Sequence, residues 1–183
     1  MLSPIDPACI GFPDEETMSE DQGLVENHEY TDLRGFWTLD DWSRLVQEEQ
    51  ELLDLIESGQ NPDDDELFNR FCDYDFYRMS IDPGVATTVA ALVILGACPV
   101  SACSGGQGHY ETHPLVYFWA SKEQFDLIQQ AAEDAGVELS GVEHPGLLLW
   151  TEIDLDLMRS FAKNLVSIME STQKGASSCL PPA

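Results

Sequence analysis

Apolar residues recur every three or four positions over much of the chain, which is the period of a helix with one buried face. These stretches begin at residues that cap helices or end at a glycine. Ser121 and Gln124, for example, form a capping box, and Gly136 ends the helix that follows. The pattern predicts five helices, over residues 38–58, 61–72, 82–96, 121–136 and 154–168.

The helix over residues 82–96 differs from the others because it is apolar on nearly all sides, from Val85 to Leu95. We therefore expect it to be the most buried helix. Asp82 is expected to cap it, with Pro83 at the first helical position and Gly96 at its end.

Short runs of branched and aromatic residues between these helices predict four strands, over residues 98–102, 115–120, 137–142 and 147–153. The last two enclose a turn at residues 143–146 and are expected to form a hairpin. Two of the strand connections are too short for crossovers, so antiparallel or mixed pairing is expected. The predicted fold is α+β, with a small sheet of about four strands covered by helices.

The same patterns divide the chain into four parts. Residues 1–35 have no sustained period and are expected to form a flexible acidic arm. Residues 36–80 are expected to form an acidic helical region that packs on a body formed by residues 81–170. Residues 171–183 are mostly polar, with two prolines just before the last residue, so a flexible tail is predicted there.

The net charge is extreme for a chain of 183 residues, because 34 Asp and Glu face eight Lys and Arg, which gives −26. Residues 1–80 hold 22 acidic and four basic residues, and residues 81–183 hold 12 and four. The acid is therefore concentrated in the arm and the first helices. This field would speed the encounter with a basic protein.

Composition also excludes several function classes. The few basic residues are scattered and form no patch, so direct binding of nucleic acid is not expected. The longest apolar run, residues 89–100, is too short to span a bilayer, and no signal peptide is recognisable. The five cysteines are widely spaced without a Cys-x-x-Cys pair, which favours a reduced, cytoplasmic setting.

The candidate partner-binding residues lie in the acidic helical region. They are the carboxylates of one helix and of the next helix start, with one aromatic anchor: Asp40, Asp41, Glu48, Glu49, Asp63, Asp64, Asp65, Glu66 and Trp37. The run 63–66 lacks the glycine and the final glutamate of an EF-hand loop, so a capped helix start is predicted there instead of a calcium site.

The most unusual segment runs from Cys103 to His113 and contains a thiol, a hydroxyl, two imidazoles and three glycines. Cys103 with His109 or His113 could form a nucleophile pair, with Glu111 as a candidate third group. The loop residues Ser104, Gly105, Gly106 and Gly108 could cradle a small anion. Cys103, His109 and His113 could form a partial metal site, and a plain glycine turn is the remaining alternative. We assign no metal and no cofactor from the sequence.

Residues 101–105, Ser-Ala-Cys-Ser-Gly, follow a helix and a short strand. This stretch resembles the Ser-Cys-Ser-Gly signature of the wybutosine-synthesis family, whose members are α+β methyltransferases that act on tRNA with S-adenosylmethionine. The family motif continues with arginine, where this chain has Gly106. The resemblance implies a local fold of helix, strand, small-residue loop and strand, and we do not transfer the activity.

Two function hypotheses follow. The leading one is an acidic protein-binding module without enzymatic activity, of the inhibitor, immunity-protein or antitoxin type, that neutralises a basic partner protein. The alternative is an enzyme or small-ligand binder that uses the loop from Cys103 to His113. No membrane partner is expected, and the sequence specifies no oligomeric state.

Overall fold

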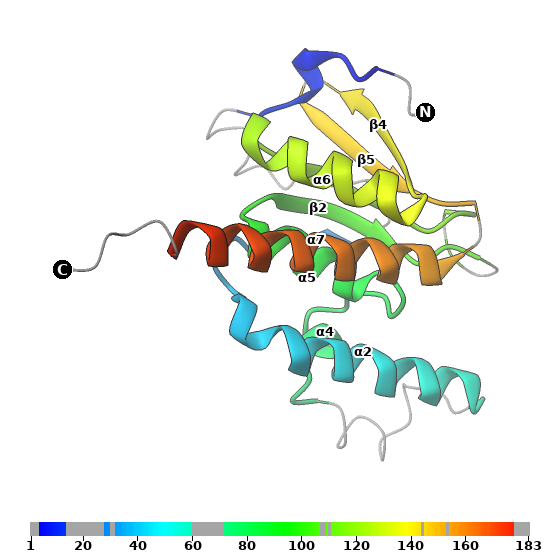
Figure 1. Cartoon of the computed structure of the whole chain (residues 1–183). Coiled ribbons are helices and arrows are strands. Elements are labelled where there is room, and N and C mark those ends of the chain that lie inside the picture. The colour runs from blue at the N-terminus through cyan, green and yellow to red at the C-terminus, as the bar shows by residue number, and fades with distance from the viewer. Residues whose placement is uncertain are drawn as a thin grey trace.

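The computed structural model describes residues 4–13, 28–29, 32–59, 72–106, 109, 111–143, 145–152 and 154–177. Helices lie on one face of an antiparallel sheet, and one further helix packs on the outside of that layer (Figure 1). The elements are, in order, η1 (Pro7–Cys9), β1 (His28–Glu29), η2 (Leu39–Asp41), α2 (Trp42–Glu57), α4 (Asp75–Arg78), α5 (Ala86–Leu95), β2 (Cys98–Cys103), β3 (Leu115–Trp119), α6 (Lys122–Ala135), β4 (Glu138–Glu143), β5 (Gly146–Trp150) and α7 (Leu155–Ser177).

The sheet has the strand order β1-β2-β3-β5-β4, and every neighbouring pair is antiparallel. Four of the strands have five or six residues, and β1 adds two residues at one edge. Side chains alternate between the two faces, so Val116 and Phe118 of β3 point toward the helices, while Tyr117 and Trp119 line the other face. The prediction of an α+β fold with a small antiparallel sheet is confirmed.

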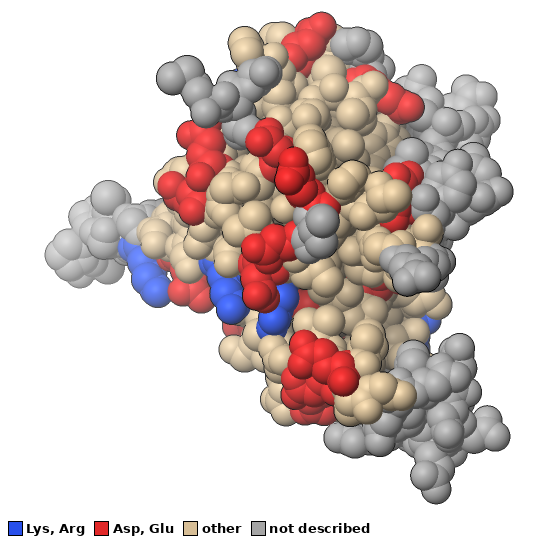
Figure 2. All heavy atoms as spheres, turned by 90° about the vertical axis from the view of Figure 1, so that its right-hand side faces the viewer, with Lys and Arg blue, Asp and Glu red and all other residues tan. Residues whose placement is uncertain are grey.

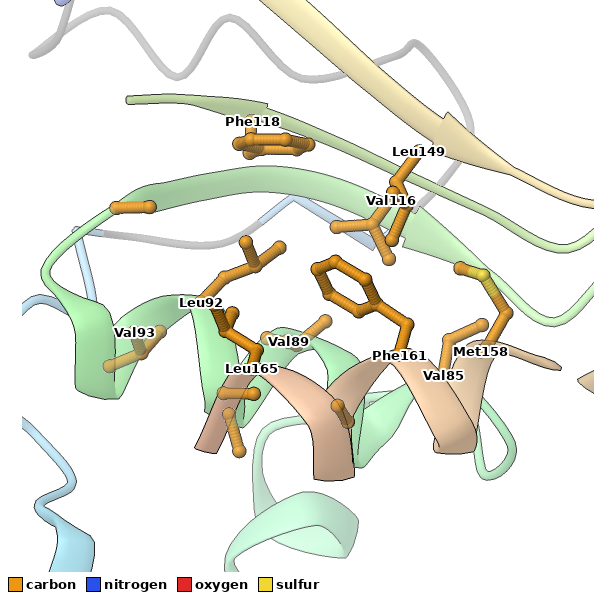
Figure 3. Packing of buried hydrophobic residues seen from close by; sticks show 14 of the residues in the cluster. Val85, Val89, Leu92, Val93, Val116, Phe118, Leu149, Met158, Phe161 and Leu165 are labelled. Atoms are coloured by element: carbon orange, nitrogen blue, oxygen red, sulfur yellow. The ribbon is translucent and has the colours of Figure 1, made fainter. Parts of the chain in front are cut away.

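The main core lies between the sheet and helices α5 and α7. Figure 3 shows Leu92 of α5 and Phe161 of α7 directed toward Phe118, Val116 and Leu149 of the sheet. All five of these side chains are fully buried. Burial of each side chain stabilises the fold by about 1.5–3 kcal/mol. Helix α5, which is apolar on nearly all sides, is the most buried helix, as predicted.

Local capping signals in the sequence predicted several helix ends correctly. Ser121 and Gln124 form the predicted capping box at the start of α6, and Gly136 ends that helix with a φ of 74°. Gly96 ends α5 with a φ of 91°. The predicted cap at Asp82 is wrong: α5 begins only at Ala86, and the Asp82 side chain turns toward the loop after β2.

Both terminal regions contain more structure than the sequence predicted. Residues 7–9 form η1, which packs on β4, where Gly141 has no side chain and lets Cys9 approach closely. The expectation of a flexible arm therefore does not hold for residues 4–13. Helix α7 continues to Ser177, so the expected tail is helical over residues 171–177. The helix predicted over residues 61–72 falls almost entirely outside the described residues.

Helix α2 packs on α5 through Leu45, Leu52 and Leu55, which are buried in the same core. The short helix α4 was not predicted; it lies beside α2. Among the described residues, no helix has both the length and the apolar character needed to cross a membrane.

Candidate functional site

The unusual loop begins where β2 ends. Cys103 is the last residue of β2 and pairs with Leu115 of β3, so its backbone position is fixed by the sheet. The loop then returns past His109 to β3. Asp82 lies just before α5, on a segment that runs beside the start of this loop. Three parts of the chain that are separated in sequence therefore meet at one end of β2.

At this point a thiol, an imidazole and a carboxylate converge. The Sγ atom of Cys103 lies 3.5 Å from Nδ1 of His109, and the same nitrogen lies 3.4 Å from Oδ2 of Asp82. All three atoms lie within 4.8 Å of one another. Cys103 is buried, Asp82 is half-buried, and His109 reaches the surface with 38% of its side chain exposed. The cluster is thus open to solvent on the imidazole side.

Backbone groups of the loop hold the Asp82 carboxylate and the Cys103 sulfur in place. The N–H and hydroxyl groups of Ser104 both donate to Oδ2 of Asp82, at 3.1 and 3.4 Å. The N–H of Gly105 donates to the Cys103 sulfur at 3.4 Å. Gly105 has a φ of 72°, and a Cβ atom there would lie 2.5 Å from the carbonyl carbon of His113. Only glycine fits at this position.

Burial in the sheet raises the pKa of the Cys103 thiol, and the nearby carboxylates of Asp82 and Glu111 act in the same direction. The backbone N–H groups of Gly105 and Glu111 oppose this shift but do not reverse it. Because the thiolate is the reactive form, a thiol with a raised pKa is a poor nucleophile at neutral pH.

The arrangement also differs from a catalytic triad in its geometry. In a triad the nucleophile and the orienting carboxylate contact opposite nitrogens of the histidine ring. Here Cys103 and Asp82 contact the same nitrogen of His109. The third group is Asp82, whereas the sequence analysis named Glu111. Instead, a sulfur, a nitrogen and a carboxylate oxygen face one point, which is how protein ligand atoms surround a metal ion.

The second histidine of the loop is not part of this cluster. Nδ1 of His113 lies 2.5 Å from the carbonyl oxygen of Glu152, and its ring packs edge-on to Trp150 at 6.2 Å. Ser104, Gly105 and Gly106 form the first part of the loop, as predicted, and Gly108 is outside the described residues. The metal site suggested by the sequence therefore keeps Cys103 and His109 but not His113.

The acidic candidates of the N-terminal region divide into exposed and buried groups. Asp40 is exposed, and Asp41 accepts hydrogen bonds from the N–H and hydroxyl of Thr38, both at 2.9 Å. These bonds lower the pKa of Asp41. Residues 63–66 lie outside the described part of the chain. Trp37 is only 2% exposed and donates to Asp75 at 3.0 Å, so it belongs to the core and offers no anchor to a partner.

Glu48 and Glu49 were named as candidate partner-binding residues, but the structure buries both side chains. Glu48 is 6% exposed and pairs with Arg44, and Glu49 is completely buried. Glu49 accepts from the N–H groups of Gly84 and Thr87 at 2.9 and 3.2 Å and from the Thr87 hydroxyl at 2.6 Å. It also pairs with Arg159 at 3.6 Å. Glu49 thus caps α5, the role expected of Asp82.

The sequence did contain a signal for this burial. Glu49 follows Leu45 by four positions and precedes Leu52 by three, which places it on the apolar stripe of α2. A carboxylate in such a stripe must find donors inside the protein, because an unpaired buried charge is very costly. Its partners come from residues 35 or more positions away and carry no local pattern.

A second acidic feature lies on the body, where the sequence analysis placed none. A hollow of about 570 Å³ lies between the starts of β4 and α7 and the end of β5. The carboxylates of Glu138, Glu152 and Asp154 line it together with the half-buried ring of Trp150. In the part of the chain that the structure describes, no Lys or Arg forms an ion pair with these three carboxylates.

Most cations of the described chain are already paired internally. Of its seven Lys and Arg residues, five form ion pairs with neighbouring carboxylates: Arg34, Arg44, Lys122, Arg159 and Lys174. Figure 2 shows one face of the molecule, with acidic side chains spread from top to bottom and most of its basic ones gathered in one band beside acidic groups. Folding therefore leaves the negative charge dominant at the surface.

Comparison with known proteins adds no further assignment. No family model, no curated protein and no solved structure matches this chain. The local resemblance of residues 101–105 to the wybutosine-synthesis family stays a prediction.

Proposed function

We propose that the chain is an acidic protein-binding module that neutralises a basic protein, in the manner of an inhibitor, immunity protein or antitoxin. The observation that carries this proposal is the charge that remains after folding. The net charge is −26, and most described cations are bound to carboxylates of the same chain. Such a surface attracts a positively charged partner over distances comparable to the Debye length.

The hollow of Glu138, Glu152 and Asp154 supports the proposal at short range. Its carboxylates would receive the charged end of an inserted Lys or Arg side chain, and the Trp150 ring would face the cation. Asp40 and the exposed carboxylates of α2 would add to the attraction at longer range. In this proposal the direct contact surface lies on the body, and the N-terminal acid contributes mainly to the rate of encounter.

The proposal is tested by affinity capture from native cell extract with the full chain, followed by a binding titration of the captured protein at several salt concentrations. The expected partner is basic, and its affinity falls as salt rises. A triple variant of the hollow, Glu138→Gln with Glu152→Gln and Asp154→Asn, is expected to weaken binding by about tenfold or more.

The matched control removes the same charge elsewhere. The variant Asp40→Asn with Asp54→Asn and Glu57→Gln changes three exposed carboxylates at and along α2 and is expected to slow association while leaving dissociation nearly unchanged. Capture of no basic protein, or of a partner that is insensitive to salt, would count against the proposed function. Equal effects of both triple variants on dissociation would remove the hollow from the contact surface.

A second candidate function, a small-ligand site, is favoured by one observation. Asp82 comes from a separate segment of the chain and lies within 4.8 Å of the ligand atoms of Cys103 and His109. The raised pKa of Cys103 disfavours a covalent enzyme.

A further inference from the structure

We propose that Asp82, Cys103 and His109 bind a divalent transition-metal ion of the zinc class, independently of any protein partner. The three side chains offer a sulfur, a nitrogen and an oxygen that face one another within 4.8 Å. Mixed sulfur and nitrogen ligands select zinc among the common metal ions, whereas calcium and magnesium require oxygen ligands. The donor set therefore identifies the class of ion.

The two distances from His109 to the other ligands fit a tetrahedral ion. With zinc bonds of about 2.3 Å to sulfur and about 2.0 Å to nitrogen and oxygen, tetrahedral geometry places sulfur and nitrogen about 3.6 Å apart, and nitrogen and oxygen about 3.3 Å apart. The observed distances are 3.5 Å between Cys103 and His109, and 3.4 Å between His109 and Asp82. Both ligand pairs that include His109 thus already have the spacing that a bound ion requires.

The surroundings of the donors have the features that stabilise metal ligands. The carboxylate of Asp82 is held by two donors of Ser104, and the sulfur of Cys103 receives the N–H of Gly105. Such outer hydrogen bonds orient ligands and are a regular part of metal sites. Cys103 is further fixed by the sheet, and the turn at Gly105 returns the chain toward it. The ligands are therefore preorganised, which reduces the cost of binding.

Three protein ligands leave one tetrahedral position, and the exposed side of the cluster is the side of His109. An open fourth position filled by water or a small ligand distinguishes reactive or regulatory zinc sites from closed structural ones. Binding converts the thiol to a thiolate and releases its proton to solvent, because zinc deprotonates a coordinating thiol.

The test uses the full chain, freed of metal with a chelator, and titrates it with Zn²⁺ and separately with Co²⁺. We expect one equivalent of Zn²⁺ to bind, in competition with a coloured chelator. Co²⁺ should give a near-ultraviolet charge-transfer band from thiolate to cobalt together with the strong visible absorption of a four-coordinate ion. These bands distinguish the site from Co²⁺ bound to surface carboxylates, which on this acidic chain form weak oxygen-only complexes.

Two histidine variants provide a matched comparison within one loop. His109→Ala should lower Zn²⁺ affinity by about 100-fold or more and abolish the cobalt bands. His113→Ala, whose side chain bonds the Glu152 carbonyl instead, should leave both unchanged. Cys103→Ser should remove the charge-transfer band. Because Cys103 is buried, circular dichroism checks its folding, and the exposed His109 variant decides the question if Cys103→Ser does not fold.

A wild-type chain that gives no charge-transfer band, or one that persists in His109→Ala, would overturn the proposal. Equal loss of the bands in both histidine variants would overturn the assignment of ligands. Neither result bears on the capture of a basic partner, so the two proposals fail separately.

Discussion

At the scale of single residues, Gly105 determines the path of the loop that carries His109. Its φ of 72° is unfavourable for other residues, and a Cβ atom would collide with the backbone of His113 and Pro114 at 2.5 and 2.7 Å. Gly106 also has a positive φ, 101°, but a Cβ atom there would meet nothing within 4 Å. A side chain at either glycine would strain the backbone, but only one at Gly105 would also collide with neighbouring atoms. Comparing substitutions at the two positions therefore separates the cost of strain from the cost of collision.

We predict that Gly105→Ala destabilises the protein by about 1–3 kcal/mol more than Gly106→Ala, because only the first requires the segment at residues 113–114 to move. The measurement is the free energy of unfolding in urea. The Gly105 variant should also bind Co²⁺ more weakly than the Gly106 variant, since the N–H to the Cys103 sulfur is displaced. Equal destabilisation by both substitutions would show that the loop relaxes without cost.

Residue patterns predicted part of the candidate site. The sequence identifies Cys103 and His109 because a thiol and imidazoles among glycines are unusual. It could not identify Asp82 as their neighbour, because that contact depends on how the chain turns between residues 82 and 85 before α5 begins. His113 has the same chemistry as His109, and only the structure shows that it faces Glu152 instead.

At the scale of elements, Glu49 joins three helices. It belongs to α2, accepts two N–H groups at the start of α5, and pairs with Arg159 of α7. A buried carboxylate with full hydrogen bonding holds its neighbours in one arrangement, and the loss of such a partner leaves donors and a cation unpaired. The position of the acidic helical region on the body therefore depends on this side chain.

We predict that Glu49→Ala lowers the free energy of unfolding by about 3–5 kcal/mol. Amide exchange at Gly84 and Thr87, whose N–H groups lose their acceptor, should accelerate relative to the centre of α5. Glu57→Ala, an exposed substitution with the same charge change on the same helix, should change stability by less than about 0.5 kcal/mol. Similar effects of the two variants would refute the capping role of Glu49.

Elements were predicted well where their signals are local. The capping box of Ser121 and Gln124, the glycines after α5 and α6 and the run of branched and aromatic residues in β3 are all local signals within a few residues. The misplaced start of α5 has a different origin, because Asp82 is drawn to Ser104 and a carboxylate from α2 takes its role. At the start of α5, long-range partners therefore decided the outcome.

At the scale of the whole molecule, folding redistributes the charge that dominates the sequence. The N-terminal acid is not a uniform outer face, since Glu48 and Glu49 are buried and hydrogen-bonded. The hollow of Glu138, Glu152 and Asp154 lies in the less acidic half of the chain. Composition therefore predicted the sign of the surface charge, while the location of the carboxylates that have no Lys or Arg partner among the described residues depended on the tertiary structure.

The same imbalance leads to a prediction about stability. A chain with a net charge of −26 repels itself most strongly in its compact state, so screening by salt should favour folding. Between about 10 and 200 mM KCl at pH 7, the free energy of unfolding should rise by about 1 kcal/mol, equivalent to about 2–4 °C in the midpoint of thermal unfolding. Salt also weakens ion pairs within the chain, such as that of Lys122 and Asp126. This pair is exposed to solvent, and exposed ion pairs contribute little to stability.

The control is the pH at which the measurement is made. As pH falls toward the isoelectric point near 4.1, carboxylates gain protons, the net charge approaches zero, and the stabilisation by KCl should shrink. A midpoint that falls with KCl at pH 7 would mean that internal ion pairs outweigh the self-repulsion. The charge would then be balanced within the fold and would not remain available to attract a basic partner.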